Sequence, residues 1–158
     1  MTHTSGTSCP STPRLWSSLP FSGHGWGRIM SDPINPAYYQ TAPENTGIRG
    51  ECIEYATDLG FVLGSAFKYV WRAGRKGDIE QDLNKAARLL EYAVEHGAFK
   101  GDAHLRVDLG HPQTPRRRIL HLITRSDAAT TREAARLIRA ALDNPKRLAT
   151  IDHPITRQ

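Results

Sequence analysis

The sequence contains few cysteines and no long apolar run. Its 158 residues include only Cys9 and Cys52, too few for a disulfide framework, so we expect a reducing, cytoplasmic setting. No apolar stretch approaches the roughly 18–20 residues that are needed to cross a bilayer. Residues 1–11 are too polar for a secretory signal. Together these absences predict a protein without a membrane partner.

Several catalytic motifs are also missing. The sequence contains no G-x-x-x-x-G-K-[ST] loop, which excludes a standard P-loop kinase. It has no Cys/His spacing typical of a metal site, and its seven histidines are dispersed along the chain. No Ser-His-Asp set can be proposed from spacing alone. The candidate chemistry therefore rests on lysines, arginines and carboxylates.

Apolar residues are scarce near the beginning of the chain. Residues 1–29 are rich in Ser, Thr, Gly and Pro, and this composition predicts disorder. Met30 looks like a second, natural beginning, so one hypothesis is that translation starts there.

The whole chain carries a formal net charge of +5 and has a pI near 9.5, which favours anionic partners.

The periodicity of the apolar residues predicts an all-α fold. Three segments carry apolar residues at spacings of three and four, and we expect them to form a small helical bundle within residues 30–98. Gly60, Gly74 and Gly97 follow these segments, where glycine commonly ends a helix. No strand pattern competes in this region. The expected helices cover residues 48–59, 62–73 and 78–96.

The remainder of the chain is more basic. Residues 99–114 are expected to form a linker, and residues 115–158 a basic helical extension that ends in a tail. Thr130 and Glu133 have the spacing of a capping box, which predicts a helix start at Thr130. Residues 112–158 contain ten Lys and Arg against four Asp and Glu. This surplus is typical of a solvated face, and contact with nucleic acid is the alternative.

The most informative stretch is a run of cations at a predicted helix end. Lys68, Arg72, Arg75 and Lys76 lie within nine residues, on the expected second helix and in the glycine turn after it. Lysine binds phosphate as a point charge and arginine as a planar fork. The run therefore predicts a phosphate-binding site. The alternative is that these charges are the solvated faces of short helices, paired from residue i to i+4.

Four short motifs follow one another through residues 32–97. They are Asn35-Pro36-Ala37-Tyr38-Tyr39, Glu51-Cys52-Ile53-Glu54, the stretch GSAFKYVWRAGRKG at 64–77, and Asp82-Leu83-Asn84-Lys85-Ala86. With these motifs the sequence resembles small phage-encoded proteins that include a nucleoside monophosphate kinase without a P-loop. Most members of that family are known only as a domain of unknown function. One departure is that the family usually has His-Tyr where this chain has Tyr38-Tyr39.

The resemblance implies an enzyme of the host cytoplasm that transfers phosphate from a nucleoside triphosphate to a (deoxy)nucleoside monophosphate. It implies Lys68 and Arg72 as catalytic residues and Tyr39 as the ring on which the base stacks. An ion pair with Asp82 is the alternative role for Lys85. The expected phosphate ligands are Arg75, Lys76 and Lys85, and the expected ligands of a magnesium cofactor are Glu51, Glu54 and Asp82.

Two other functions fit the same residues. Helical nucleoside triphosphate pyrophosphohydrolases also use an E-x-x-E helix and a later acidic pair, and Glu51, Glu54, Glu80 and Asp82 resemble that arrangement. The third possibility is a non-enzymatic protein that sequesters nucleotides or associates with DNA through the basic C-terminal helices. Because a three-helix unit is small, we also expect self-association into a homo-oligomer.

Overall fold

The computed structural model describes residues 34–101 and 103–155. Within these residues the chain forms helices and no strand, so the all-α prediction is confirmed. The predictions of disorder at residues 1–29 and of a start at Met30 lie outside the described residues. The helices are α1 (Ala37–Gln40), α2 (Cys52–Asp58), α3 (Gly60–Arg72), α4 (Ile79–His96), α5 (Pro115–Thr124), α6 (Ala128–Leu142) and α7 (Pro145–Ala149).

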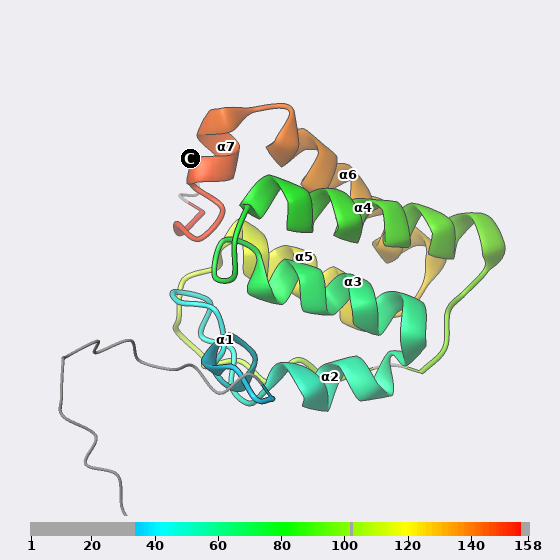
Figure 1. The fold of residues 1–158 in the computed structure, drawn as a ribbon, viewed down its shortest axis with the longest axis horizontal. Coiled ribbons are helices and arrows are strands. Elements are labelled where there is room, and N and C mark those ends of the chain that lie inside the picture. The colour runs from blue at the N-terminus through cyan, green and yellow to red at the C-terminus, as the bar shows by residue number, and fades with distance from the viewer. Residues whose placement is uncertain (1–33, 102, 156–158) are drawn as a thin grey trace, which may run out of the picture.

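Four of these helices form the centre of the molecule. α3 packs on α4 and α5, and α6 also packs on α4 and α5, so the four helices close into a bundle (Figure 1). α2 lies against the outside of α3, and α1 contacts the ends of both. The predicted bundle of about three helices is not the arrangement found. α5 and α6, which were expected to be an extension, supply half of the central bundle.

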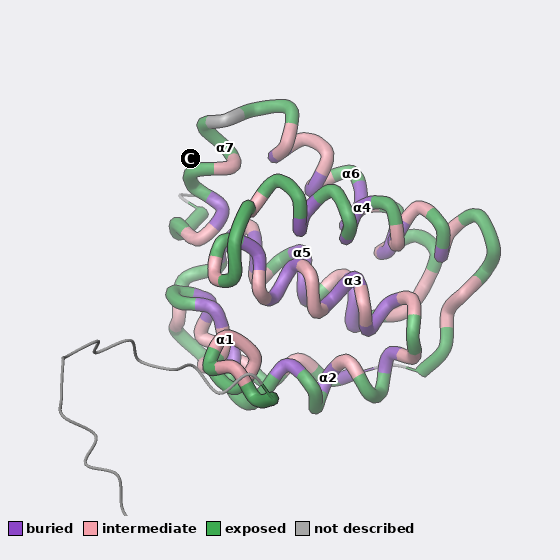
Figure 2. Tube along the Cα trace, in the orientation of Figure 1, coloured by how far each residue is buried: buried purple, intermediate pink, exposed green. Residues whose placement is uncertain are grey.

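The core lies between these four helices. Each helix turns one apolar stripe inward, as a spacing of three and four residues dictates. The buried segments accordingly face one another across the bundle (Figure 2). Fully burying one large apolar side chain contributes about 1.5–3 kcal/mol. The largest fully buried apolar side chains are Leu59, Leu63, Phe67, Trp71, Leu83, Leu90, Ile119, Leu120, Ile123, Ile138 and Ile151.

The ends of α4 follow the sequence signals closely. The side chain of Asp78 accepts a hydrogen bond from the backbone N–H of Glu80 at 2.9 Å, as an N-cap does. Gly97 ends the helix in the left-handed conformation, with φ of 62°. Gly74 also has a positive φ, 76°, and ends α3 as predicted. These local signals fix where the chain turns between α3 and α4.

The start of α6 differs from the prediction. The N-cap is Asp127, whose carboxylate accepts hydrogen bonds from both the N–H and the hydroxyl of Thr130. Thr130 therefore lies in the first turn, and the capping box that it was expected to form with Glu133 is absent. Further on, Asn144 caps a short helix, α7, in the region that was expected to be a tail.

α2 and α3 are packed at close range. An ideal Cβ built on Gly64 would lie 2.3 Å from the carbonyl oxygen of Ala56, so only glycine fits there without a shift. α2 itself begins at Cys52, four residues later than predicted. Ile48, which was expected to open that helix, instead pairs in an isolated antiparallel bridge with Val107.

The segment between α4 and α5 is held against the rest of the fold. The N–H of Arg49 donates to the carbonyl of Arg106 at 2.9 Å, and the N–H of Asp108 donates to the carbonyl of Gly47 at 2.7 Å. Arg106 also forms an ion pair with Glu54 on α2. The residues predicted as a linker thus anchor the start of α2.

None of the helices in the described ranges has the length and apolar character required to cross a membrane.

Candidate functional site

Arg72 and Asp82 form a buried ion pair that joins the end of α3 to the first turns of α4. Arg72 Nε lies 3.1 Å from Asp82 Oδ2, and Arg72 Nη2 lies 2.9 Å from Asp82 Oδ1. Only 13% of the Arg72 side chain and 6% of the Asp82 side chain are exposed. Burial acts to lower the pKa of Arg72, but the hydrogen bonds with Asp82 and Tyr39 raise it above its usual value. The two residues therefore contact each other.

Arg72 also fixes Tyr39. Its Nη1 donates to the Tyr39 hydroxyl at 2.9 Å. A guanidinium has five N–H donors, and Arg72 uses three of them on Asp82 and Tyr39. The other two N–H donors of Arg72 make no hydrogen bond with a described residue. The predicted stacking ring and the predicted catalytic arginine are thus adjacent in the structure.

Arg75 holds α1 in place. Its Nη1 donates to the carbonyls of Tyr38 at 3.0 Å and of Thr41 at 2.8 Å, and its Nη2 donates to the Thr41 hydroxyl at 2.7 Å. The indole N–H of Trp71 donates to the same Tyr38 carbonyl at 3.1 Å. Burial, and after it the charge of Arg116, lower the pKa of Arg75. Its contact with phosphate stays a prediction, since its contacts here position α1.

Three cations surround the ring of Tyr69. Arg72 Cζ lies 4.7 Å from the ring centroid, Lys68 Nζ 5.2 Å and Lys85 Nζ 5.7 Å. Arg72 is neutralised by Asp82, whereas Lys85 donates to the amide oxygen of Gln81 at 3.0 Å. Lys85 does not form the alternative ion pair with Asp82. Neither lysine pairs with a carboxylate in the described part of the chain, so this cluster favours an anion.

A pocket of about 370 Å³ opens beside this cluster, between α1, α2 and α3. We call it the Tyr39–Lys68 pocket. Lys68 lines this pocket and also lies over the Tyr69 ring, so this lysine belongs to both the pocket and the cation cluster. Its volume is at the lower end of the range of small-molecule sites. The lining residues are Ile34, Asn35, Tyr39, Glu51, Cys52, Ile53, Ala56 and Lys68.

The three predicted magnesium ligands do not meet. Glu51 lines the Tyr39–Lys68 pocket, Glu54 is paired with Arg106, and Asp82 is paired with Arg72. Over residues 34–101 and 103–155, no three His, Cys, Asp or Glu side chains are grouped so that they could hold a metal ion. In this arrangement the predicted set does not fit a metal site formed by the protein alone.

Lys76 and Tyr38 lie beside the site rather than in it. Lys76 is exposed, and its Nζ lies 5.8 Å from the centroid of the Tyr38 ring. The Tyr38 ring in turn meets the Tyr39 ring edge to face, with centroids 4.6 Å apart. The position at which the resembling family usually has histidine is therefore adjacent to the stacking ring, and neither Tyr38 nor Lys76 lines the pocket.

The sequence did not predict the roles of two residues near the site. Asn35 begins the Asn-Pro-Ala-Tyr-Tyr motif and lines the pocket, and its motif gave no functional role for it. Arg116, only 2% exposed, donates to the carbonyls of Val70 at 2.7 Å and Ala73 at 3.0 Å, and pairs with Asp152. It therefore caps the end of α3 on which Arg72 lies. An arginine just after Pro115 gives no sequence signal that separates it from a surface arginine.

Comparison with known proteins identifies one region. Residues 35–91 match a family model that is described only as a protein of unknown function, DUF3310. The matched region contains the Tyr39–Lys68 pocket residues from Asn35 onward and the cations around Tyr69, and it ends within α4. Neither a search of curated proteins nor a search of solved structures finds a match.

Proposed function

We propose that the protein binds a nucleotide in the Tyr39–Lys68 pocket, with the phosphates directed to the cations around Tyr69. The observation that carries this proposal is the position of Lys68, which lines the pocket and also lies over the Tyr69 ring, with Nζ 5.2 Å from its centroid. A nucleotide combines a flat base with a chain of negative charge. The ring of Tyr39 in the pocket and the cations that Lys68 shares with the Tyr69 cluster complement these two parts.

Each group in the site has a role in this proposal. The base stacks on Tyr39, an interaction that tolerates any base because every base has a π-face. The amide of Asn35 offers both a donor and an acceptor to the edge of the base. Lys68, Lys85 and the two remaining N–H donors of Arg72 bind the phosphate oxygens. Charge-assisted hydrogen bonds of this kind are about twice as strong as neutral ones.

We propose phosphoryl transfer from a nucleoside triphosphate to a nucleoside monophosphate as the reaction. Phosphoryl transfer depends mainly on positioning and on stabilisation of negative charge, with little covalent chemistry by the protein. Lys68, Lys85 and Arg72 supply positive charge from two different helices. Magnesium enters the proposal only as the ion that accompanies the triphosphate, since the predicted carboxylates do not form a common site. The motif resemblance supports this choice of reaction.

The arrangement of acids favours transfer over pyrophosphate release. A pyrophosphohydrolase of the kind considered above needs its carboxylates grouped around magnesium. Glu54 and Asp82 are both bound to arginines, Arg106 and Arg72. Nucleotide sequestration without chemistry uses the same pocket and differs only in its products.

Product analysis tests the reaction. The full chain is incubated with magnesium and a nucleoside triphosphate, with and without each (deoxy)nucleoside monophosphate, and the products are separated by ion-exchange chromatography. A kinase forms two diphosphates and only when an acceptor is present. Pyrophosphate released from the triphosphate alone would support the hydrolase instead, and bound nucleotide without product would support sequestration.

A thermal-shift screen tests the binding itself. A ligand that binds the folded state raises Tm, so we expect a rise with at least one nucleoside mono- or triphosphate. The rise should be lost in Lys68→Ala and kept in Lys146→Ala, which removes an exposed lysine on α7. If no nucleotide changes Tm of the wild-type chain, the assignment of the pocket is wrong.

A further inference from the structure

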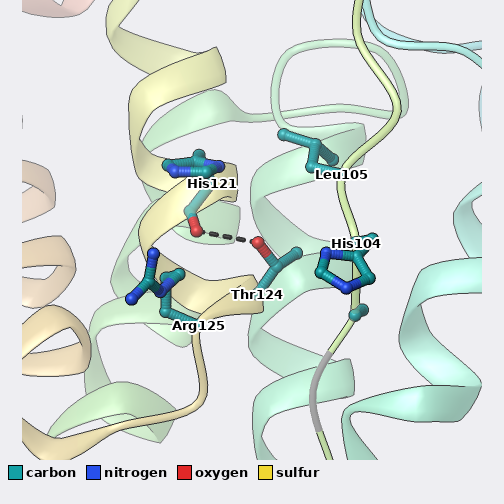
Figure 3. Close-up of a pocket in the computed structure, with 6 residues that line it drawn as sticks. His104, Leu105, His121, Thr124 and Arg125 are labelled. Atoms are coloured by element: carbon teal, nitrogen blue, oxygen red, sulfur yellow. Dashed lines mark hydrogen bonds between the residues drawn. The ribbon is translucent and has the colours of Figure 1, made fainter.

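A second cavity, outside the proposed nucleotide pocket, is lined in part by basic side chains, those of His104, His121 and Arg125. It measures about 350 Å³ and lies between α5 and the extended segment that precedes it (Figure 3). It shares no lining residue with the Tyr39–Lys68 pocket. The lining residues are Ala103, His104, Leu105, His121, Thr124 and Arg125.

The basic groups approach this cavity from two sides. His121 lies in the last turn of α5, and Arg125, the C-cap of that helix, follows one turn later, so the two share a face. His104 lies opposite, on the extended segment, with Thr124 between the two sides (Figure 3). The Thr124 hydroxyl donates to the backbone carbonyl of His121 at 2.7 Å, so its proton is already used.

No described carboxylate forms an ion pair with the basic side chains of this cavity. The described lining residues include no Asp or Glu. The side chains of His104, His121 and Arg125 make no ion pair with a described residue. Asp127 is near enough to Arg125 to have its pKa lowered, after the larger effect of its hydrogen bonds with Thr130. Those hydrogen bonds commit the Asp127 carboxylate to the N-cap of α6.

We propose that this cavity binds a phosphate group. Arg125 offers a planar fork of N–H donors, and each imidazole offers at least one N–H donor in either charge state. Donors from two opposed segments can surround a tetrahedral oxyanion. Residues 112–158, which include His121 and Arg125, carry a net positive charge that favours anionic ligands. The site is independent of the proposed nucleotide pocket, and it takes either a free phosphate or a phosphodiester of single-stranded nucleic acid.

Histidine ring signals in NMR spectra of the full chain test this proposal. The His104 and His121 signals are assigned by His→Gln substitution and followed during titration with inorganic phosphate and, separately, with a short single-stranded oligonucleotide. We expect saturable shifts of both signals with at least one of the two ligands. Saturation at lower concentration with the oligonucleotide identifies the phosphodiester as the preferred source, and the reverse order identifies free phosphate.

Matched charge variants separate this site from general attraction. Arg125→Gln should weaken binding by about tenfold, the loss expected for a charge-assisted hydrogen bond. Arg147→Gln makes the same change of charge on α7 and should leave the affinity within about twofold, since only weak surface electrostatics are altered. Equal effects of the two substitutions, or signals that stay unmoved with both ligands, would overturn the proposal. Lys68→Ala should leave these shifts intact, so a failure of the nucleotide pocket is read separately.

Discussion

At the scale of single residues, Arg72 connects the parts of the candidate site. It pairs with Asp82, donates to the Tyr39 hydroxyl and lies over the Tyr69 ring. Each of these contacts limits where the guanidinium can go, so its two remaining donors have a defined direction. A surface arginine would have to lose rotamer freedom on binding phosphate, which costs up to about 2 kcal/mol. The order already present in the free protein reduces that cost.

Substitutions of Tyr39 separate its ring from its hydroxyl. Tyr39→Ala removes the proposed stacking surface and should lower nucleotide affinity by about tenfold or more, because base stacking contributes about 1–3 kcal/mol. Tyr39→Phe keeps the ring and loses only the hydrogen bond with Arg72, so we expect a smaller loss. Calorimetric titration checks both. Equal losses in the two variants would contradict stacking as the role of Tyr39.

Cys52 should be unreactive while the protein is folded. Burial raises the pKa of its thiol to about 12, although Lys68 and the arginines nearby act in the opposite direction. Alkylation requires the thiolate. In a Cys9→Ser variant at pH 8, iodoacetamide should therefore modify the folded chain on the order of a hundredfold more slowly than the urea-unfolded chain. Because the pKa is raised by folding, the contribution of Cys52 to stability is complete below pH 8 and decreases as pH rises from about 9 towards 12.

Mass spectrometry measures the rate at which iodoacetamide alkylates Cys52 in the folded chain and in the urea-unfolded chain. Rapid labelling of Cys52 in the folded chain would contradict its burial.

At the scale of helices, the end of α3 depends on a side chain from α5. Arg116 donates to the carbonyls of Val70 and Ala73 and pairs with Asp152. Carbonyls at a helix end carry partial negative charge and have no partner within the helix. Arg116 supplies the hydrogen-bond donors for these carbonyls. Its bond to the Ala73 carbonyl also holds the turn that separates Arg72 from Arg75.

Replacing Arg116 should therefore destabilise the fold. Arg116→Met leaves the α3 carbonyls and the Asp152 carboxylate without their partner, and we expect the free energy of unfolding to fall by about 3 kcal/mol. Arg118→Met is the control, because Arg118 is exposed and should change stability by no more than about 0.5 kcal/mol. Urea unfolding measures both. A similar midpoint and slope for wild type and Arg116→Met would show that the capping contacts are unimportant.

Helix limits were predictable where local signals were strong. Asp78 and Gly97 bracket α4, and the structure places its ends there. The start of α6 was missed because Asp127 and Thr130 are both good N-cap residues and the sequence alone does not rank them. The assembly of α5 and α6 with α3 and α4 could not be predicted, since periodicity shows which face of a helix is apolar and does not show which helix covers it.

The site was predictable only in part, for the same kind of reason. Tyr39, Glu51 and Lys68 do line one pocket. Glu54 pairs with Arg106, and Asp82 pairs with Arg72. Residue spacing does not show whether a carboxylate will bind a metal ion or an arginine that is distant in the sequence.

At the scale of the whole molecule, the C-terminal helices are needed for the core. α4 packs against α6 along much of its length, and α3 packs against α5 (Figure 1). A chain that ends at Ala98 would expose the apolar faces of α3 and α4 to water. We expect residues 1–98 to show no cooperative thermal transition in circular dichroism. A sharp transition would instead support residues 30–98 as a domain that folds alone.

Calorimetric titration of matched lysine variants is the most direct test of the proposed nucleotide site. The ligand is the nucleotide that gives the largest thermal shift, and the proteins are full-length wild type, Lys68→Ala and Lys146→Ala. If Lys68 joins the pocket to the phosphate cluster, Lys68→Ala should raise Kd by about tenfold or more, through loss of a charge-assisted hydrogen bond. Lys146→Ala, an equal change of charge on α7, should leave Kd within about twofold. An unchanged Kd in Lys68→Ala, with the wild type binding normally, would contradict a nucleotide site in the Tyr39–Lys68 pocket.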